Sequence, residues 1–201
     1  MNLLISGPPA CGKSHLALER FRSQPGSLLI VPTATMVEHI RHAFARSGTR
    51  SGILVRPREI CTLATFLEAW SSEAAVPAAL LDLLIEQALE RLRPERFAAV
   101  AGFPGFRRAL AELFEHVPSQ ALPADIMSLE AEIEQRLKTR DLGLRHARLR
   151  SAAGAPGAVP ANVILDGFFT LSAPETELVL ALGERTNVTI TLPDWPGSQK
   201  V

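Results

Sequence analysis

Eight residues near the start of the chain combine glycines, a lysine and a serine at a spacing that suits phosphate chemistry. They read Gly7-Pro8-Pro9-Ala10-Cys11-Gly12-Lys13-Ser14, a full G-x-x-x-x-G-K-[ST] pattern. The two glycines let the backbone curl so that its N–H groups point inward and form an anion nest. Lys13 could then reach the β and γ phosphates of ATP, and the Ser14 hydroxyl could bind Mg²⁺. The segment therefore predicts a P-loop, whose eight residues all contribute to a nucleotide site.

The flanks of this segment provide the elements that such a loop needs. Leu3-Leu4-Ile5 is a short apolar run just before it, and an amphipathic run with Leu16, Ala17 and Phe21 follows at once. A chance match in a turn rich in glycine and proline would not require these neighbours. The pattern therefore predicts a strand, the loop and a helix in succession.

A second metal-ligand candidate lies far along the chain. Val163-Ile164-Leu165 reads as a buried strand and ends in Asp166, a position typical of the Walker B carboxylate that binds Mg²⁺ beside the P-loop hydroxyl. Hydrolysis also needs a carboxylate or glutamine nearby to orient the attacking water. The next four residues, Gly167-Phe168-Phe169-Thr170, offer neither.

The rest of both ends of the chain alternates between strands and helices. Continuous apolar runs predict buried parallel strands at 28–31, 53–55, 60–63 and 188–192. Helices are expected over 35–44 with a capping box from Thr35 to Glu38, from 65 onward, and over 175–183 with Gly183 near the C-cap.

From about residue 71 the pattern becomes purely helical. Apolar side chains recur at helical spacing over 81–92, 106–117 and 126–137, and Pro94, Pro104, Pro118 and Pro123 separate these runs. A single crossover between parallel strands needs only about a dozen residues, so we expect this stretch to stand apart from the sheet. The expected fold is α/β: a RecA-like P-loop parallel sheet with an inserted all-helical subdomain. Its parts are the α/β domain at 1–70 and 161–201, the insertion at 71–150 and an exposed loop at 151–160.

Composition narrows the classes of function. Lys+Arg and Asp+Glu balance at a formal net charge of +0, so nothing global favours nucleic acid. Two cysteines suggest no disulfide framework, and no run is long enough to span a membrane, so we expect a cytoplasmic protein without a membrane partner. Aromatic residues make up 5% of the chain and tyrosine is absent, which weighs against a base-stacking platform.

Several segments also occur in the order found in a known family. They are the P-loop, Val31-Pro32-Thr33, Thr62-Leu63-Ala64-Thr65-Phe66, the helical insertion and Asp166-Gly167-Phe168. This order resembles the first motor domain of superfamily 1 helicases. It is most similar to the B subunit of AddAB-type ATP-dependent helicase–nucleases, and more distantly to RecC-like subunits.

The resemblance implies a place in DNA repair beside a partner subunit, with Thr33, Thr65 and Phe66 along a single-stranded DNA path. Active helicases follow the Walker B aspartate with Glu and, two residues later, Gln, where this chain has Gly167 and Phe169. The B subunits share Asp-Gly-Phe and are regarded as nucleotide-binding partners that do not translocate. A second motor domain and a nuclease domain, both expected of the family, are not in the printed sequence. The chain is then an N-terminal piece of a longer protein, or the resemblance extends only to the fold.

One alternative from another class is a small-molecule kinase of the nucleoside monophosphate type. Asp166-Gly167-Phe168 resembles the Asp-Gly-Phe-Pro-Arg of adenylate kinases, but Phe169 and Thr170 stand where Pro-Arg is required. The separation of 153 positions between Lys13 and Asp166 is also too long for that family.

Two basic runs could follow a phosphate backbone or form solvated helix ends. One comprises Arg41, Arg46, Arg50, Arg56 and Arg58, and the other Arg136, Lys138, Arg140, Arg145, Arg148 and Arg150. The five histidines show no metal-ligand spacing.

Overall fold

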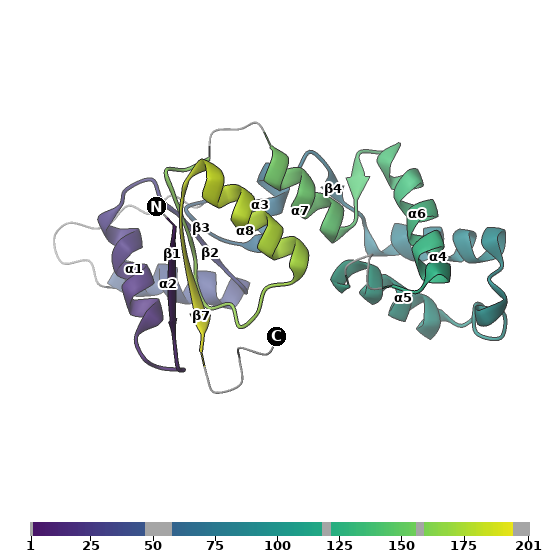
Figure 1. Ribbon diagram of the computed structural model, residues 1–201, viewed down its shortest axis with the longest axis horizontal. Coiled ribbons are helices and arrows are strands. Elements are labelled where there is room, and N and C mark those ends of the chain that lie inside the picture. Colours follow the sequence, from purple (N-terminus) through teal and green to yellow (C-terminus); the bar gives the residue numbers. More distant parts are fainter. Residues whose placement is uncertain (1, 47–57, 118–121, 156–158, 195–201) are drawn as a thin grey trace. The chain divides into compact units, whose positions relative to one another are not determined.

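Five short apolar segments form one parallel sheet (Figure 1). The computed structural model describes residues 2–46, 58–117, 122–155 and 159–194. The strands are β1 (Leu3–Gly7), β2 (Leu28–Val31), β3 (Ile60–Thr62), β6 (Asn162–Leu165) and β7 (Asn187–Pro193). They lie in the order β1-β7-β6-β2-β3, and every neighbouring pair is parallel. The predicted α/β class with a parallel central sheet is confirmed.

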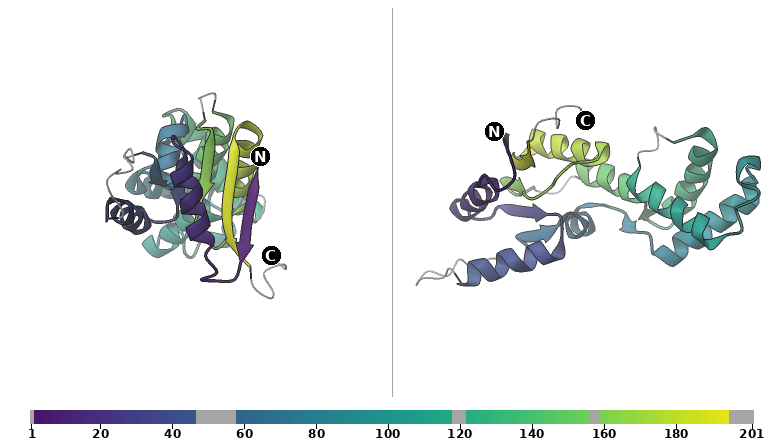
Figure 2. Two further views of the ribbon diagram at one scale, coloured as in Figure 1. Left: turned by 90° about the vertical axis from the view of Figure 1, so that its left-hand side faces the viewer. Right: turned by 90° about the horizontal axis from the view of Figure 1, so that it is seen from below.

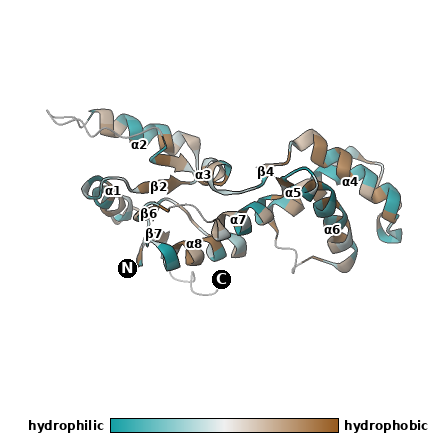
Figure 3. Ribbon diagram, turned by 90° about the horizontal axis from the view of Figure 1, so that it is seen from above, coloured by the Kyte–Doolittle hydropathy of each residue, from teal (hydrophilic) through white to brown (hydrophobic). Residues whose placement is uncertain are grey.

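Helices cover both faces of this sheet, as a continuous apolar strand requires. Figure 3 shows β2 hydrophobic along its length, with α2 (Ala34–Arg46) and α8 (Ala173–Arg185) on opposite sides of the strands. Leu29 and Val31 of β2 pack against α2 and α1 (Lys13–Ser23) in one core cluster. Successive side chains of a strand point to opposite faces, so Leu28 and Ile30, also buried, face the other layer.

Helix starts differ from the expected ones by one or two residues. Helix α2 begins at Ala34, and its cap is Thr33, whose hydroxyl accepts a hydrogen bond from the Met36 N–H at 3.2 Å. The capping box predicted at Thr35 was therefore wrong, because the helix starts directly after Pro32-Thr33. Helix α3 (Leu63–Trp70) likewise starts at Leu63 rather than Thr65, directly after β3.

Gly183 has a different role from the predicted one. It lies inside α8 instead of capping it, and its carbonyl accepts a hydrogen bond from the Asn2 side chain at 3.1 Å. A Cβ at this position would lie 2.7 Å from Asn2 Nδ2, so glycine permits this close approach. The strand expected at 53–55 lies outside the described residues.

The chain divides by its internal contacts into two units. The sheet unit comprises Met1–Ala69, Pro156–Leu171 and Thr176–Val201, and the helical unit comprises Trp70–Ala155 and Ser172–Glu175. Figure 2 gives two further views of their elements, with β1 at one edge of the sheet in the left-hand view.

Apolar residues at helical spacing build the core of the helical unit. Its elements are α4 (Ala78–Leu92), the 3₁₀ turn η1 (Glu95–Phe97), α5 (Pro104–His116), α6 (Ala124–Lys138) and α7 (Arg145–Gly154). Pro94, Pro104 and Pro123 stand at the starts of η1, α5 and α6 as expected, and Pro118 lies outside the described residues. Leu84, Ile85, Phe114, Leu129 and Ile133 are among the side chains that form one buried cluster.

Two expectations for this unit were wrong. It is not entirely helical, because β4 (Ala74–Ala75) and β5 (Leu142–Gly143) pair in parallel. Residues 151–154 belong to α7 rather than to an exposed loop, and Ala152 is fully buried. Within the described ranges, no helix has the length and apolar character needed to cross a membrane.

Candidate functional site

The 7–14 segment connects the end of β1 to the start of α1. Gly12, with φ 92°, and Ala10, with φ 62°, both adopt left-handed backbone conformations, which glycine tolerates without the penalty that a side chain adds. Gly7 has a second steric requirement, since a Cβ there would lie 2.8 Å from Cys11 Sγ. The glycine positions therefore match the local geometry of the loop, as the motif predicts.

Lys13 folds back over this loop. Its Nζ donates hydrogen bonds to the Gly7 carbonyl at 2.7 Å and the Pro8 carbonyl at 2.6 Å, and lies 3.6 Å from Cys11 Sγ. Two of the three ammonium protons are thus satisfied by the loop's own backbone. An anion entering the loop could compete for the same donor group, which carries a full positive charge.

Asp166 directly follows β6, and its side chain contacts Ser14 at the start of α1. Its carboxylate is only 1% exposed, and Oδ1 accepts hydrogen bonds from Ser14 Oγ at 3.0 Å and Thr191 Oγ1 at 2.6 Å. A buried carboxylate is costly unless such partners compensate for lost water. The structure therefore brings together Ser14 and Asp166, the two residues predicted from the sequence to bind the metal. Lys13 directly precedes Ser14 in the chain.

Ser14 Oγ and Asp166 Oδ1 lie 3.0 Å apart because they share a hydrogen bond. Both are oxygen atoms of the kind that Mg²⁺ prefers as ligands. Within the described residues no three His, Cys, Asp or Glu side chains form a metal-binding group. A cation here would rely on one carboxylate, one hydroxyl, water and phosphate oxygens, which is the coordination that Mg²⁺ usually keeps.

Thr191 is a site residue that the sequence did not indicate. Strand β7 lies between β1 and β6, and this places Thr191 beside Asp166. Its hydroxyl also accepts a hydrogen bond from the Gly167 N–H at 3.2 Å. The only sign of Thr191 in the sequence was a hydroxyl side chain within the apolar run 188–192. Its contact with Asp166 depends on the strand order, which the sequence does not give.

The three residues proposed for a DNA path differ in their exposure to solvent. Thr33 and Thr65 are exposed after the carboxyl ends of β2 and β3, and Thr65 Oγ1 lies 3.1 Å from Thr62 Oγ1. Phe66 is 1% exposed and points into the core. The ring of Phe66 is therefore inaccessible to a ligand in this conformation, because the first turn of α3 directs it inward.

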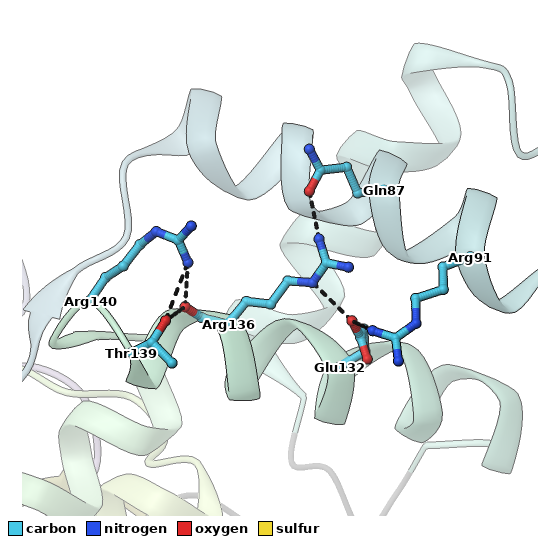
Figure 4. A network of polar contacts seen from close by, with 6 residues as sticks. All are labelled: Gln87, Arg91, Glu132, Arg136, Thr139 and Arg140. Carbon is cyan, nitrogen blue, oxygen red and sulfur yellow. Dashed lines mark hydrogen bonds and ion pairs between the residues drawn. The ribbon is translucent and has the colours of Figure 1, made fainter.

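The basic run from Arg136 to Arg150 is largely engaged by nearby groups. Figure 4 shows Arg136 between Glu132, at 2.8 Å, and Gln87, at 2.6 Å, while Arg140 donates to the Arg136 carbonyl at the end of α6.

Further along this run the contacts are also internal. Arg145 pairs with Glu175 at 2.7 Å, and the buried Arg148 donates to the Glu73 carbonyl. These contacts favour the helix-end interpretation of this run. Arg41 of the other run pairs with Glu38 and donates to the Ile60 carbonyl.

In the helical unit, the side chains of His146 and Glu134 have shifted pKa values. His146 Nε2 lies 2.7 Å from Glu134 Oε1, and this hydrogen bond lowers the pKa of Glu134 although burial opposes the shift. Burial disfavours the charged imidazole, but the contacts with Glu134 and Glu130 raise the pKa of His146. This pair belongs to the packing of α6 against α7 and not to the 7–14 loop.

No protein-family model and no curated protein sequence matches this chain.

Proposed function

We propose that this chain binds ATP and Mg²⁺ through a P-loop formed by residues 7–14. Asp166 is the metal's carboxylate partner in this proposal, and the sheet is a RecA-like nucleotide-binding fold. The observation that carries it is the Ser14–Asp166 contact. It joins the two elements that hold the metal in such a site, a hydroxyl at the start of a helix and an aspartate at the end of a strand. The Lys13 ammonium beside the same loop supplies the charge for a phosphate.

We further propose that the chain acts as a motor-like domain with little or no hydrolytic activity. Residues 167–171 contain no carboxylate and no glutamine that could orient the attacking water. Binding ground state and transition state equally does not accelerate a reaction. Such a domain would bind ATP without hydrolysing it. This agrees with a role as a structural and DNA-binding subunit beside a partner in a DNA-repair helicase–nuclease.

The test is a thermal melt of the full chain with and without Mg·ATP. Ligand at about 100 times its Kd stabilises a protein by about 2.7 kcal/mol, which corresponds to a rise in Tm of about 5–10 °C for this length. Lys13→Ala should abolish the rise, whereas Lys138→Ala, a matched lysine on α6, should keep it. Absence of any shift in the folded wild-type protein would contradict the proposal.

The kinase of the nucleoside monophosphate type remains the alternative activity. No described side chain directly after Asp166 supplies the arginine that it needs, since Phe169 and Thr170 occupy those places. Transfer of the γ-phosphate to a nucleoside monophosphate by this chain would establish the kinase in place of the motor-like domain.

A further inference from the structure

Phe169 is the most exposed large apolar side chain among the described residues. Its exposed fraction is 75%, whereas that of its neighbour Phe168 is 9%. Burying such an apolar ring stabilises a protein, and Phe169 forgoes this stabilisation within the chain. Isolated apolar residues are common on protein surfaces. Exposure alone therefore does not indicate a binding role for Phe169, and its position in the fold has to be considered.

The backbone places Phe169 beside the proposed nucleotide site. Gly167 turns the chain with φ 84°, and a Cβ there would lie 2.5 Å from Met36 Cε and 3.5 Å from Pro32 Cδ. The segment after β6 is therefore packed on the connection between β2 and α2.

Chain length also limits the distance to the site. Three residues span at most about 11 Å, so Phe169 lies within that distance of Asp166. Ligands of open parallel sheets bind outside the carboxyl ends of the strands, and Phe169 follows the carboxyl end of β6. Phe169 thus follows the same edge of the sheet at which Ser14, Thr33 and Asp166 follow β1, β2 and β6, and its ring is exposed.

We propose that Phe169 is a stacking surface for a nucleobase, supplied by the bound nucleotide or by single-stranded DNA. This inference rests on the proposed function and adds a contact to it. A phenyl ring has no donor or acceptor, so it would take the π-face of any base without reading its sequence. Phe66, the aromatic expected on the DNA path, is buried and cannot serve in this way. The low aromatic content argues against a platform of several rings but is compatible with one ring and one base.

Equilibrium binding to two variants tests this contact. Phe169→Ala removes the ring and Phe169→Leu keeps an apolar side chain without a π-face, while Phe103→Ala is the matched control at another exposed phenylalanine, 61% exposed on the helical unit. The probes are Mg·ATP, Mg·tripolyphosphate, an oligothymidylate and an abasic strand of the same length.

Stacking on an aromatic ring contributes about 1–3 kcal/mol per base, so we expect Phe169→Ala to weaken binding of the base-bearing probe about 5- to 150-fold. Phe169→Leu should recover only part of this loss, and the base-free probes and Phe103→Ala should show none. A loss for ATP alone assigns the base to the nucleotide, and a loss for the oligothymidylate alone assigns it to the DNA strand.

The inference is overturned if both base-bearing probes bind Phe169→Ala as they bind the wild type, or if the wild type binds neither. An equal loss for tripolyphosphate and ATP also overturns it, because the ring would then act on the loop and not on a base. The proposed function fails separately, when Lys13→Ala binds ATP and tripolyphosphate unchanged.

Discussion

The hydroxyl oxygen of Ser14 lies 3.0 Å from Oδ1 of Asp166, although 152 positions separate the two residues in the chain. The contact exists because β7 completes the sheet between β1 and β6, which brings the start of α1 to the end of β6. Thr191 of β7 then donates a second hydrogen bond to the same carboxylate oxygen. A local motif and a distant strand end thus form one polar site only in the assembled sheet.

Replacing Thr191 should weaken the fold through Asp166. Thr191→Val keeps the shape of the side chain but removes its hydrogen bonds to Asp166 and from Gly167. Buried polar groups that lose a partner cost about 1–3 kcal/mol each, so we expect the free energy of unfolding to fall by about that amount. Denaturant titration measures it. Thr189→Val, also buried on β7, is the control, and an equal loss in both variants would contradict a special role for Thr191.

The His146–Glu134 pair should make stability depend on pH in two directions. The pKa of His146 is raised above its ordinary 6.5, so its contribution is complete below about pH 6.5 and is lost as pH rises through the raised value. The pKa of Glu134 is lowered below its ordinary 4.5, so its contribution is present above about pH 4.5 and is lost as pH falls through the lowered value. The pair therefore stabilises most between about pH 4.5 and 6.5.

Melts of wild type and His146→Gln across pH 4–9 measure this dependence. Glu130, whose Oε1 lies 3.8 Å from His146 Nδ1, and Arg150, 3.8 Å from Glu134, face the same pair and should modulate it. We expect the stability difference between the two proteins to shrink as pH rises above 6.5. A difference that grows from pH 6.5 to 9 would show that His146 stabilises the fold in its neutral form.

The two cysteines should react at very different rates. Cys11 is exposed in the 7–14 loop, whereas Cys61 is buried in β3, and burial raises the pKa of the Cys61 thiol to about 11. Only a thiolate is an effective nucleophile, so Cys61 should remain unlabelled in the folded protein. Alkylation followed by mass spectrometry should find Cys11 modified first, and more slowly with Mg·ATP present. Unchanged labelling of Cys11 at saturating Mg·ATP would place the nucleotide elsewhere.

Turnover of ATP should stay near background. A positioned general base contributes about 10²–10⁴-fold to a rate, and residues 167–171 supply none. Release of γ-phosphate should therefore be close to the uncatalysed level with or without single-stranded DNA. Turnover near about one per second would contradict this, and its dependence on DNA or on a nucleoside monophosphate would identify the activity.

Part of the sheet was predictable from the sequence because its strands β2 and β6 are buried on both faces. Leu28–Val31 and Val163–Leu165 are unbroken apolar runs, and such runs signal parallel strands without any knowledge of their partners. The 7–14 motif and Asp166 could be found for a similar reason, since each is defined by its immediate neighbours.

What could not be predicted depends on which elements become neighbours. Helix α7 was missed because it buries His146 and Arg148, residues that normally indicate a solvated surface. Their burial follows from contacts with Glu134 and the Glu73 carbonyl, which lie on other elements. Thr191 was missed for the same reason, and Phe66 gave no sign of which way the first turn of α3 would point it.

Calorimetric titration of the full chain with Mg·ATP tests the central claim most directly. Hydrogen bonds to charged groups are worth about 1.5–3 kcal/mol, so Lys13→Ala should weaken binding about 10- to 150-fold while Lys138→Ala leaves it unchanged. Omitting Mg²⁺ should weaken wild-type binding, and Asp166→Asn should remove most of that metal dependence. Saturable binding with this pattern is the predicted result. No binding by the folded wild type, or equal affinity in wild type and Lys13→Ala, would contradict it.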